Sequence, residues 1–399
     1  MQQTIDNNNI PTQETNEEEH PQMLLYEACK EGDLEQVKQI LEKPDLEADI
    51  EGTDNDNWKP LHHAIHGGNM EVIRYLVNEK GAILGSIIDT EEGHEAFMFA
   101  VTDGHLEVVK YIAENGGEDM MDKENDYDLR PLHLACLWGH FDIVKYLVEE
   151  QDVYTDAVDG RDGWTGLHYA SLCGDLDIVR FLAEEHHVDA ESTEVDGWTA
   201  LHCAANTGHV EIVKYLLEQQ EVDRDALVKN VDRNALHLAA SEGCLDIVKY
   251  LVEEQGFDID EVSSDDDTAY HLAAAYGQLD IVKYFIEERC AGDNEARFNM
   301  LFATNNNELT MYNIAVDRVE LEDDYANQEV VDYLYSYVAL LAVPSSDEDE
   351  EPCVKLNPEL SEQQRKVTEE SYRLLEDTAV HEVAYHIMGY LCLSDVKQL

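Results

Sequence analysis

Residues 199–219 read TALHCAANTGHVEIVKYLLEQ, and two phrases within this stretch recur along the chain. The first phrase, ALHCA, has eight other forms: LLYEA, PLHHA, AFMFA, PLHLA, GLHYA, ALHLA, AYHLA and MYNIA. The second phrase, VEIVKYLL, follows eight of the nine copies after a glycine, in forms such as LEVVKYIA and LDIVKYFI. Successive copies are 34 to 42 residues apart, and a period of this length indicates an array of similar supersecondary units.

Both phrases have the features of short helices. A threonine or asparagine often precedes the first phrase, and its side chain can accept hydrogen bonds from the free amides at a helix N-terminus. Pro60 and Pro131 fit the first helical position, where a missing N–H costs nothing. The glycine between the phrases fits a left-handed residue in a tight turn. The expected N-cap residues are Thr165, Thr199, Thr268, Thr310 and Asn234.

The unit resembles the ankyrin repeat, whose signature is T-P-L-H-x-A. The resemblance covers roughly residues 23–343 and implies an all-α solenoid of about nine helix-turn-helix units with projecting hairpin-like loops. The ninth unit lacks the glycine, and we interpret DRVELEDDYANQ (317–328) as an insertion between its two helices. We expect four segments: a disordered, polar and acidic tail (1–22), the repeats (23–343), an acidic Pro/Ser linker (344–359) and a helical C-terminal tail (360–399).

Charge and composition restrict the partners. The 399 residues include 26 Lys and Arg against 88 Asp and Glu, which gives a formal net charge of −62. Binding of nucleic acid or an anionic membrane requires clustered Lys and Arg, so we expect neither partner. The eight cysteines form no CxxC pair and no calcium-loop motif is present, so we expect no metal and no cofactor. The polar start and the lack of a long apolar run predict an intracellular protein, cytoplasmic and/or nuclear.

Three repeated columns have both a structural and a functional interpretation. Six histidines fall in the signature column, one per unit, and such spacing along a stack disfavours a shared metal or acid–base site. A ladder of tyrosines in the second phrase forms either a binding stripe or a seam between helices. Each basic residue of that phrase stands three residues after an acid, which predicts i,i+3 ion pairs and leaves no basic groove. The histidines are His62, His133, His168, His202, His237 and His271.

Tryptophans and acids mark a candidate binding face. Trp58, Trp164 and Trp198 directly precede the N-cap position, where each acts either as a hydrophobic staple or as an anchor for a partner. The loops before the first phrases are acidic: residues 184–196 contain six acids and residues 253–267 contain eight, without Lys or Arg. The resemblance places these loops as fingers beside a groove. Their charge either only solubilises the protein or binds a basic or neutral surface of a partner protein. The acids assigned to this face are Asp162, Asp196 and Asp266.

The C-terminal tail has two interpretations. Residues 381–399, HEVAYHIMGYLCLSDVKQL, resemble the start of an F-box, although Ala379 and Val380 replace its Leu-Pro and the chain stops about halfway. The same segment also fits an amphipathic helix that caps the last repeat. In the linker, Ser345 and Ser346 each have an acid three residues on, a pattern of acidophilic kinase sites. The residues that match the F-box pattern and would bind a Skp adaptor are Glu382, Val383, Ile387, Tyr390 and Leu391.

These patterns predict a monomeric, non-catalytic scaffold that binds another protein. No GxSxG, Walker, HRD or HExxH phrase occurs, and we assign no catalytic residue. The alternative is a substrate receptor of a cullin-type ubiquitin ligase, in which the repeats bind the substrate and the tail binds the Skp adaptor.

Overall fold

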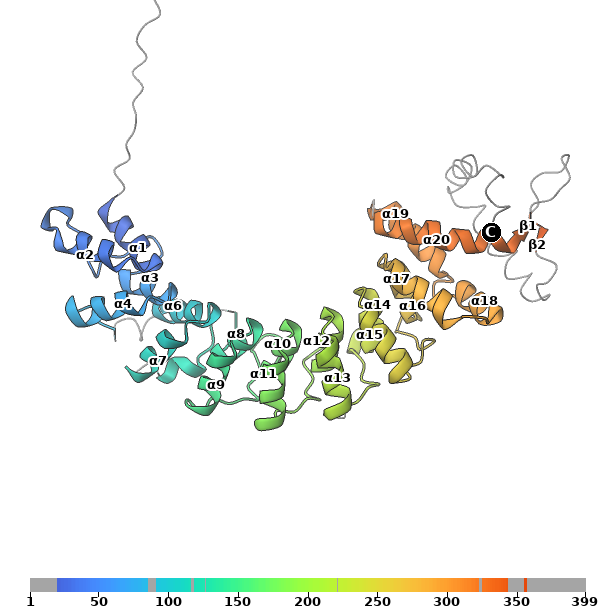
Figure 1. Cartoon of the computed structure of the whole chain (residues 1–399), viewed down its shortest axis with the longest axis horizontal. Helices are drawn as coiled ribbons and strands as arrows, with labels where there is room; N and C mark the ends of the chain where they lie inside the picture. Colours follow the sequence, from blue (N-terminus) through green and yellow to red (C-terminus); the bar gives the residue numbers. More distant parts are fainter. Residues whose placement is uncertain are drawn as a thin grey trace, which may run out of the picture. The chain divides into compact units, whose positions relative to one another are not determined.

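The structure is a computed structural model that describes residues 20–84, 91–115, 118–125, 127–220, 222–322, 325–343 and 355–356. The chain forms two compact units, one up to Ser192 and the other from Thr193 onward. Each unit is a stack of paired helices (Figure 1), and each is described by itself.

In the first unit, a first helix and an antiparallel second helix alternate along the chain. The first helices are α1 (Pro21–Glu31), α3 (Pro60–His66), α6 (Glu91–Thr102), α8 (Pro131–Leu137) and α10 (Gly166–Cys173). The second helices are α2 (Leu34–Glu42), α4 (Met70–Arg74), α7 (Leu106–Glu114), α9 (Phe141–Glu149) and α11 (Leu176–Arg180). The helices α4 and α11 continue as π-helical turns, and two short 3-10 turns lie in the loops. These segments are η2 (Tyr75–Glu79), η4 (Phe181–Glu185), η1 (Pro44–Leu46) and η3 (Glu118–Asp122).

The second unit repeats this arrangement. Its pairs are α12 (Ala200–Thr207) with α13 (Val210–Gln219), α14 (Ala235–Ser241) with α15 (Leu245–Lys249), α16 (Ala269–Ala275) with α17 (Leu279–Lys283), and α19 (Met311–Glu322) with α20 (Tyr325–Leu341). Between them lie η5 (Lys229–Val231), the π-helical turns η6 (Tyr250–Glu254) and η7 (Tyr284–Arg289), and the additional helix α18 (Asn294–Phe302). Two short strands, β1 (Ala342–Val343) and β2 (Lys355–Leu356), pair antiparallel.

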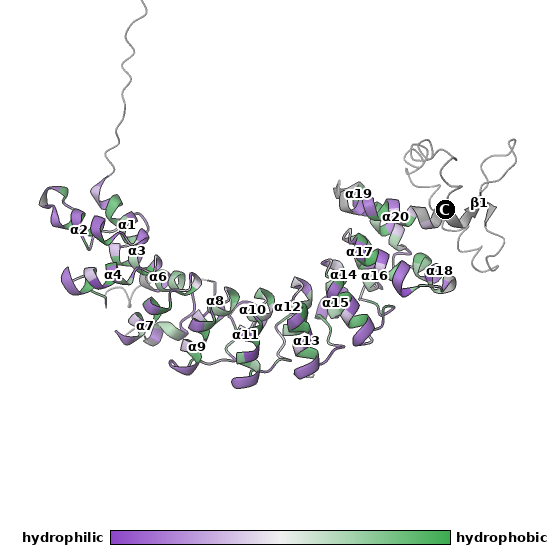
Figure 2. Ribbon diagram, in the orientation of Figure 1, coloured by the Kyte–Doolittle hydropathy of each residue, from purple (hydrophilic) through white to green (hydrophobic). Residues whose placement is uncertain are grey.

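Each core lies where the first helices pack side by side. In the first unit α1, α3, α6, α8 and α10 pack in that order, and in the second unit α12, α14, α16 and α19 do so. All nine signature alanines are buried, which allows neighbouring helices to approach closely. In Figure 2 hydrophilic colour gathers at the outer ends of second helices such as α9 and α11. No single pair could bury its apolar face alone, so stability comes from stacking.

The local signals predicted from the repeat are present at the helix ends. Thr165, Thr199, Asn234 and Thr268 are N-cap residues, and Pro60 and Pro131 occupy the first turn of their helices. Thr310 directly precedes α19, and its Oγ1 accepts a hydrogen bond from the amide of Asn313 at 3.4 Å. The eight turn glycines have φ between 70° and 90°, a region that other residues adopt only with strain.

The prediction that residues 317–328 form an insertion between the last two helices is wrong. Residues 317–322 belong to α19 and residues 325–328 belong to α20, so the additional residues lengthen both helices instead of forming a connection between them. Leu, Glu, Arg and Ala are good helix formers, so the sequence can continue each helix. The pair still packs as a repeat would, with α19 on α16 and α20 on α17.

Several expectations fall outside the described residues. These are the N-terminal tail up to residue 19, the phosphorylation candidates Ser345 and Ser346, and the F-box-like positions Glu382, Val383, Ile387, Tyr390 and Leu391. They stay predictions.

Candidate functional site

The loops before the first helices form short hairpin turns, which we call fingers. In the first unit Asp54 and Asp159 donate their backbone amides to the carbonyls of Trp58 (3.0 Å) and Trp164 (2.9 Å). In the second unit the amide of Glu194 donates to the carbonyl of Trp198 at 3.2 Å, and that of Ser263 to Asp267 at 2.9 Å. Each turn has a left-handed residue at its tip. These residues are Asn57, Gly163, Gly197 and Asp266.

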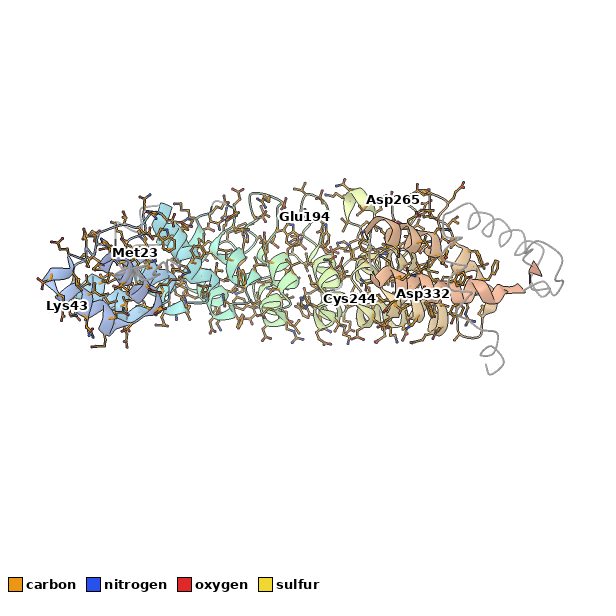
Figure 3. All side chains as sticks on the ribbon, turned by 90° about the horizontal axis from the view of Figure 1, so that it is seen from above. Met23, Lys43, Glu194, Cys244, Asp265 and Asp332 are labelled. Atoms are coloured by element: carbon orange, nitrogen blue, oxygen red, sulfur yellow. The ribbon has the colours of Figure 1, made fainter. Side chains whose placement is uncertain are left out.

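Neighbouring fingers are linked by backbone hydrogen bonds within each unit. The amide of Gly160 donates to the carbonyl of Asp128 at 3.1 Å in the first unit. In the second unit Lys229 donates to Asp196 at 2.7 Å, and Asn306 donates to Asp265 at 3.2 Å. Figure 3 shows Glu194 and Asp265 along one edge of this unit. Within each unit these bonds tie a finger to its neighbour.

One class of finger acid serves the fold. The Oδ1 atom of Asp159 accepts from the amides of Asp162 (2.9 Å), Gly163 (2.7 Å) and Trp164 (3.3 Å), and its Oδ2 accepts from the Tyr169 hydroxyl at 2.6 Å. Burial raises the pKa of Asp159, but these hydrogen bonds outweigh it and hold the pKa below its ordinary value. Glu194 accepts from two tip amides in the same way. These buried carboxylates are structural.

A second class lies at the tips and faces solvent. The predicted residues Asp162, Asp196 and Asp266 are all exposed. Only Asp196 among these three side chains accepts a described hydrogen bond, from Nδ2 of Asn230 at 2.9 Å. These carboxylates are therefore accessible to a partner.

Exposed apolar residues accompany the tip acids, and the sequence did not single them out. Val158, Val195 and Val262 lie within the fingers, and Val195 is 69% exposed. The sequence could have indicated them, because each is a valine within a strongly acidic loop. These three fingers thus offer a small apolar contact in the same loop as an exposed carboxylate, which is the mixture found at protein interfaces.

The three predicted tryptophans all pack against the helix that follows. Trp58 is 7% exposed and lies among the rings of His63 (5.4 Å), His66 (5.6 Å) and Phe99 (5.9 Å). Trp164 and Trp198 are half-buried. The Trp164 ring is 5.4 Å from that of Tyr169, and the Trp198 ring is 6.3 Å from that of His202. A role as partner anchors stays a prediction, and Trp58 has little surface left for it.

Trp138 was missed by the sequence analysis. It is 57% exposed and follows the last residue of α8. Trp138 stands three residues after the signature alanine Ala135. The residue type at this position differs from unit to unit, so no periodic pattern marked it. Tyr127, in a finger of the first unit, is also largely exposed.

The signature histidines are structural hydrogen-bonding residues. In His133 and His271, Nδ1 accepts from the backbone amide of the N-cap residue at 3.2 and 3.3 Å. The proton of these neutral rings is therefore on Nε2, which donates to a carbonyl of the next loop at 2.9 and 3.0 Å. In His237, Nδ1 lies 2.8 Å from Oδ1 of Asn234 and Nε2 lies 3.0 Å from the carbonyl oxygen of Glu261. Burial lowers the pKa of all three histidines, to about 4 for His237. Among the described residues no three His, Cys, Asp or Glu are placed to hold a metal ion.

The tyrosine ladder is a seam between second helices. Tyr75, Tyr146, Tyr215, Tyr250 and Tyr284 are each at most 5% exposed and Tyr111 is half-buried, so they do not form a binding stripe. Basic residues of one repeat lie over the ring of the next. Such pairs are Lys38 with Tyr75 (5.6 Å), Lys110 with Tyr146 (5.5 Å), Lys214 with Tyr250 (5.6 Å), Lys249 with Tyr284 (5.2 Å) and Lys283 with Tyr333 (5.7 Å).

Some lysines form the expected ion pair with the acid three residues before them. Others pair with an acid four residues later in the same helix or with an acid of the next repeat. Lys38 and Lys214 do pair with the acid three residues before, at 3.7 and 3.4 Å. Lys145 instead approaches Glu149 at 3.8 Å, and Lys249 approaches Glu288 of the next repeat at 2.9 Å. Sequence spacing could not predict the second kind of contact because it depends on how repeats stack.

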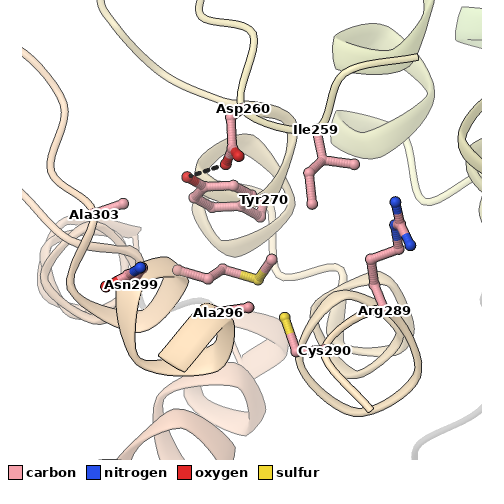
Figure 4. Close-up of a pocket in the computed structure, with 9 residues that line it drawn as sticks. Ile259, Asp260, Tyr270, Arg289, Cys290, Ala296, Asn299 and Ala303 are labelled. Carbon is pink, nitrogen blue, oxygen red and sulfur yellow. Dashed lines mark hydrogen bonds between the residues drawn. The ribbon is translucent and has the colours of Figure 1, made fainter. Parts of the chain in front are cut away.

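The second unit also contains a cavity of about 500 Å³ (Figure 4). Its walls come from the loop before α16, the end of η7 and the helix α18. The side chains of Asp260 and Tyr270 lie on one side, and Arg289 lies on another.

These features define a class of protein: stacked helix pairs that present a row of finger loops. A family model described as ankyrin repeats (3 copies) matches residues 25–124, 117–194 and 184–263, and a single-repeat model, described as ankyrin repeat, matches residues 265–297. The chain belongs to the ankyrin repeat family.

Curated relatives match over short stretches. Human SMC5-SMC6 complex localization factor protein 1 is 26% identical over 108 residues, which are 27% of this chain and 10% of that protein. Human ankyrin repeat and SOCS box protein 3 is 26% identical over 91 residues, 23% of this chain and 17% of the relative. The target of rapamycin complex 2 subunit AVO2 of Saccharomyces cerevisiae is 27% identical over 118 residues, 29% and 27% of the two chains. The chain therefore spans only about a tenth to a quarter of these proteins.

No helix in the described part of the chain has the length and apolar character needed to cross a membrane.

Proposed function

We propose that this protein is a non-catalytic scaffold that binds a partner protein through the exposed finger tips. The observation that carries the proposal is the pairing, on successive fingers, of a solvent-exposed acid with an exposed valine. Asp162 follows Val158, and Asp196 follows Val195 directly. Solubilising charge alone would need no such apolar neighbours.

The chemistry of the tips fits a partner with a basic or neutral contact surface. Carboxylates speed the encounter with a basic surface and reject acidic ones. The valines and the exposed parts of Trp164 and Trp198 supply the apolar contact that holds the complex. Hydrogen bonds between fingers fix the tips before binding, which reduces the entropy lost in the complex.

The relatives support a role in assemblies. One is named as a localization factor of a complex and another as a subunit of a complex. We expect the protein to act as a monomer in the cytoplasm and/or nucleus.

The test begins with capture of a partner on the full chain, followed by affinity measurements on variants. The triple variant Asp162→Asn, Asp196→Asn, Asp266→Asn removes three charges at the tips. A matched control, Glu114→Gln, Glu150→Gln, Glu254→Gln, removes three exposed charges from the ends of second helices and their extensions. We expect the tip variant to lose about tenfold or more in affinity. Equal effects of the two triples would show that the tips do not bind.

The ubiquitin-ligase receptor remains an alternative that rests on the tail alone. The Ile387→Asp, Leu391→Asp double variant should lose capture of a Skp adaptor if this alternative holds. Lack of capture by the unmodified chain would exclude it.

A further inference from the structure

Two departures from the repeat pattern meet at the cavity of the second unit. Tyr270 stands at the signature position where most units carry leucine. The helix α18 lies in the connection to the last helix pair, where Ala273 and Ala315 are 42 residues apart instead of 34 to 36. Because a regular repeat has neither feature, the cavity is particular to this place in the chain.

The acidic wall of the cavity is preorganised. The Tyr270 hydroxyl donates to Oδ1 of Asp260 at 3.2 Å, as Figure 4 shows. Tyr270 is 2% exposed, and burial, assisted by the charge of Asp260, raises its pKa to about 12. The hydroxyl therefore stays a donor at neutral pH, and the second oxygen of Asp260 is left for another donor. Asp260 itself is exposed.

The basic wall is a single arginine. Arg289 ends η7 and is exposed, and no described carboxylate lies within ion-pair distance of it. Arg130, by contrast, is held by Asp122 (2.9 Å) and Glu124 (3.1 Å). In a chain with 88 acids, a guanidinium at a cavity that makes no ion pair with a described carboxylate is an available anion contact.

Apolar groups lie between the two charged walls. Ile259, Ala296 and Met300 line the cavity together with Cys290 and Ala303. The volume, about 500 Å³, lies within the range of small-molecule sites. A ligand that fills it must satisfy a carboxylate at one end, a guanidinium at the other and an aliphatic surface in the middle.

We propose that this cavity binds a dipolar ligand in which an ammonium and a carboxylate are joined by an aliphatic stem. The ammonium would meet Asp260, the carboxylate would meet Arg289, and the stem would cover Met300 and Ile259. An ω-amino acid and a lysine at the carboxyl end of a peptide share this chemistry. A zwitterion carries no net charge, so the −62 of the chain does not repel it as it would an anion. The site does not include the tip residues Asp162, Asp196 and Asp266.

Three probes of similar length test the proposal on the full chain: 6-aminohexanoate, hexylammonium and hexanoate. Methyl-labelled methionine gives the readout, because Met300 lies in the cavity and Met23, in the other unit, is a control signal. We expect 6-aminohexanoate to shift the Met300 signal with an affinity about tenfold above either singly charged probe. Equal affinities, or a response of Met23 alone, would overturn the proposal.

Variants then separate the two ends. In Asp260→Asn, 6-aminohexanoate should bind no better than hexanoate, and in Arg289→Gln no better than hexylammonium. Glu242→Gln and Lys123→Gln each remove one exposed charge of the same sign outside the cavity and should leave binding unchanged. Circular dichroism confirms that each variant is folded. Retention of the full preference in both cavity variants would contradict the assignment.

The source of the ligand is resolved by a short acetylated peptide ending in lysine, with and without an amidated carboxyl end. Both a free ω-amino acid and the free-acid peptide fit the proposal, and binding of the peptide alone assigns the site to a chain terminus. If the amidated peptide bound as tightly as the free-acid peptide, the proposed contact between the ligand carboxylate and Arg289 would be contradicted.

Discussion

At the scale of single residues, the repeat depends on a histidine that must stay neutral. Nδ1 of His271 accepts from the amide of Thr268 at 3.3 Å, and Nε2 donates to the carbonyl of Ala303 at 3.0 Å. A doubly protonated ring would lose the acceptor and leave a buried charge. The sequence placed this residue correctly, because its spacing from the N-cap is local and repeats in six units.

This arrangement predicts a loss of stability on mild acidification. The pKa of His133, His237 and His271 is lowered in the folded state, so the unfolded chain binds more protons below its ordinary pKa near 6.5. The stabilisation is complete above pH 6.5 and is lost as the pH falls toward the folded value, about 4 for His237. We expect the midpoint temperature of thermal unfolding to decrease as the pH is lowered from about 7.5 to about 5.5, a range above that in which most carboxylates titrate. A midpoint that is constant or rising over this interval would contradict it.

A second residue-scale prediction compares two tryptophans of the first unit. Trp58 is 7% exposed and Trp138 is 57% exposed. Trp58→Ala should lower the free energy of unfolding by about 3–5 kcal/mol, because it removes a buried ring. Trp138→Ala should change it by about 0.5 kcal/mol or less. Urea denaturation followed by circular dichroism measures both free energies. Similar decreases in the two variants would contradict the burial of Trp58.

At the scale of elements, helices were predictable and contacts between them were not. Caps, prolines and turn glycines act within a few residues, so the sequence located the paired helices of each repeat. The tyrosine ladder left two interpretations open because burial depends on the neighbouring repeat. The placement of residues 317–328 failed for a related reason: a helix can be lengthened without any local break signal.

The seam predicts a measurable coupling between repeats. Lys214 lies 5.6 Å from the centre of the Tyr250 ring, and the Tyr250 hydroxyl donates to Glu218 of the same preceding repeat at 2.9 Å. A double-mutant cycle with Lys214→Met and Tyr250→Leu should give a coupling of about 0.5–1 kcal/mol in unfolding free energy. Lys123→Met, in the other unit, should show no coupling with Tyr250→Leu. A coupling free energy of zero between Lys214 and Tyr250 would contradict the contact across the seam.

At the scale of the whole molecule, the negative charge separates into structural and available carboxylates. Asp159 and Glu194 are buried and serve their own turns, whereas Asp162, Asp196 and Asp266 are exposed. The sequence identified the acidic loops but could not distinguish these roles, because acids of the two classes stand only two or three residues apart. It also missed the exposed valines, Trp138 and the cavity beside α18, since none belongs to the repeated pattern.

We propose that the exposed tips bind a partner by charge complementarity. The dissociation constant of the captured partner, measured from about 50 to about 500 mM salt for the unmodified chain and for the Asp162→Asn, Asp196→Asn, Asp266→Asn variant, tests this most directly. We predict that affinity falls with salt for the unmodified chain, and that the variant binds more weakly with a shallower slope. An affinity indifferent to salt and equal in the two proteins would contradict the claim.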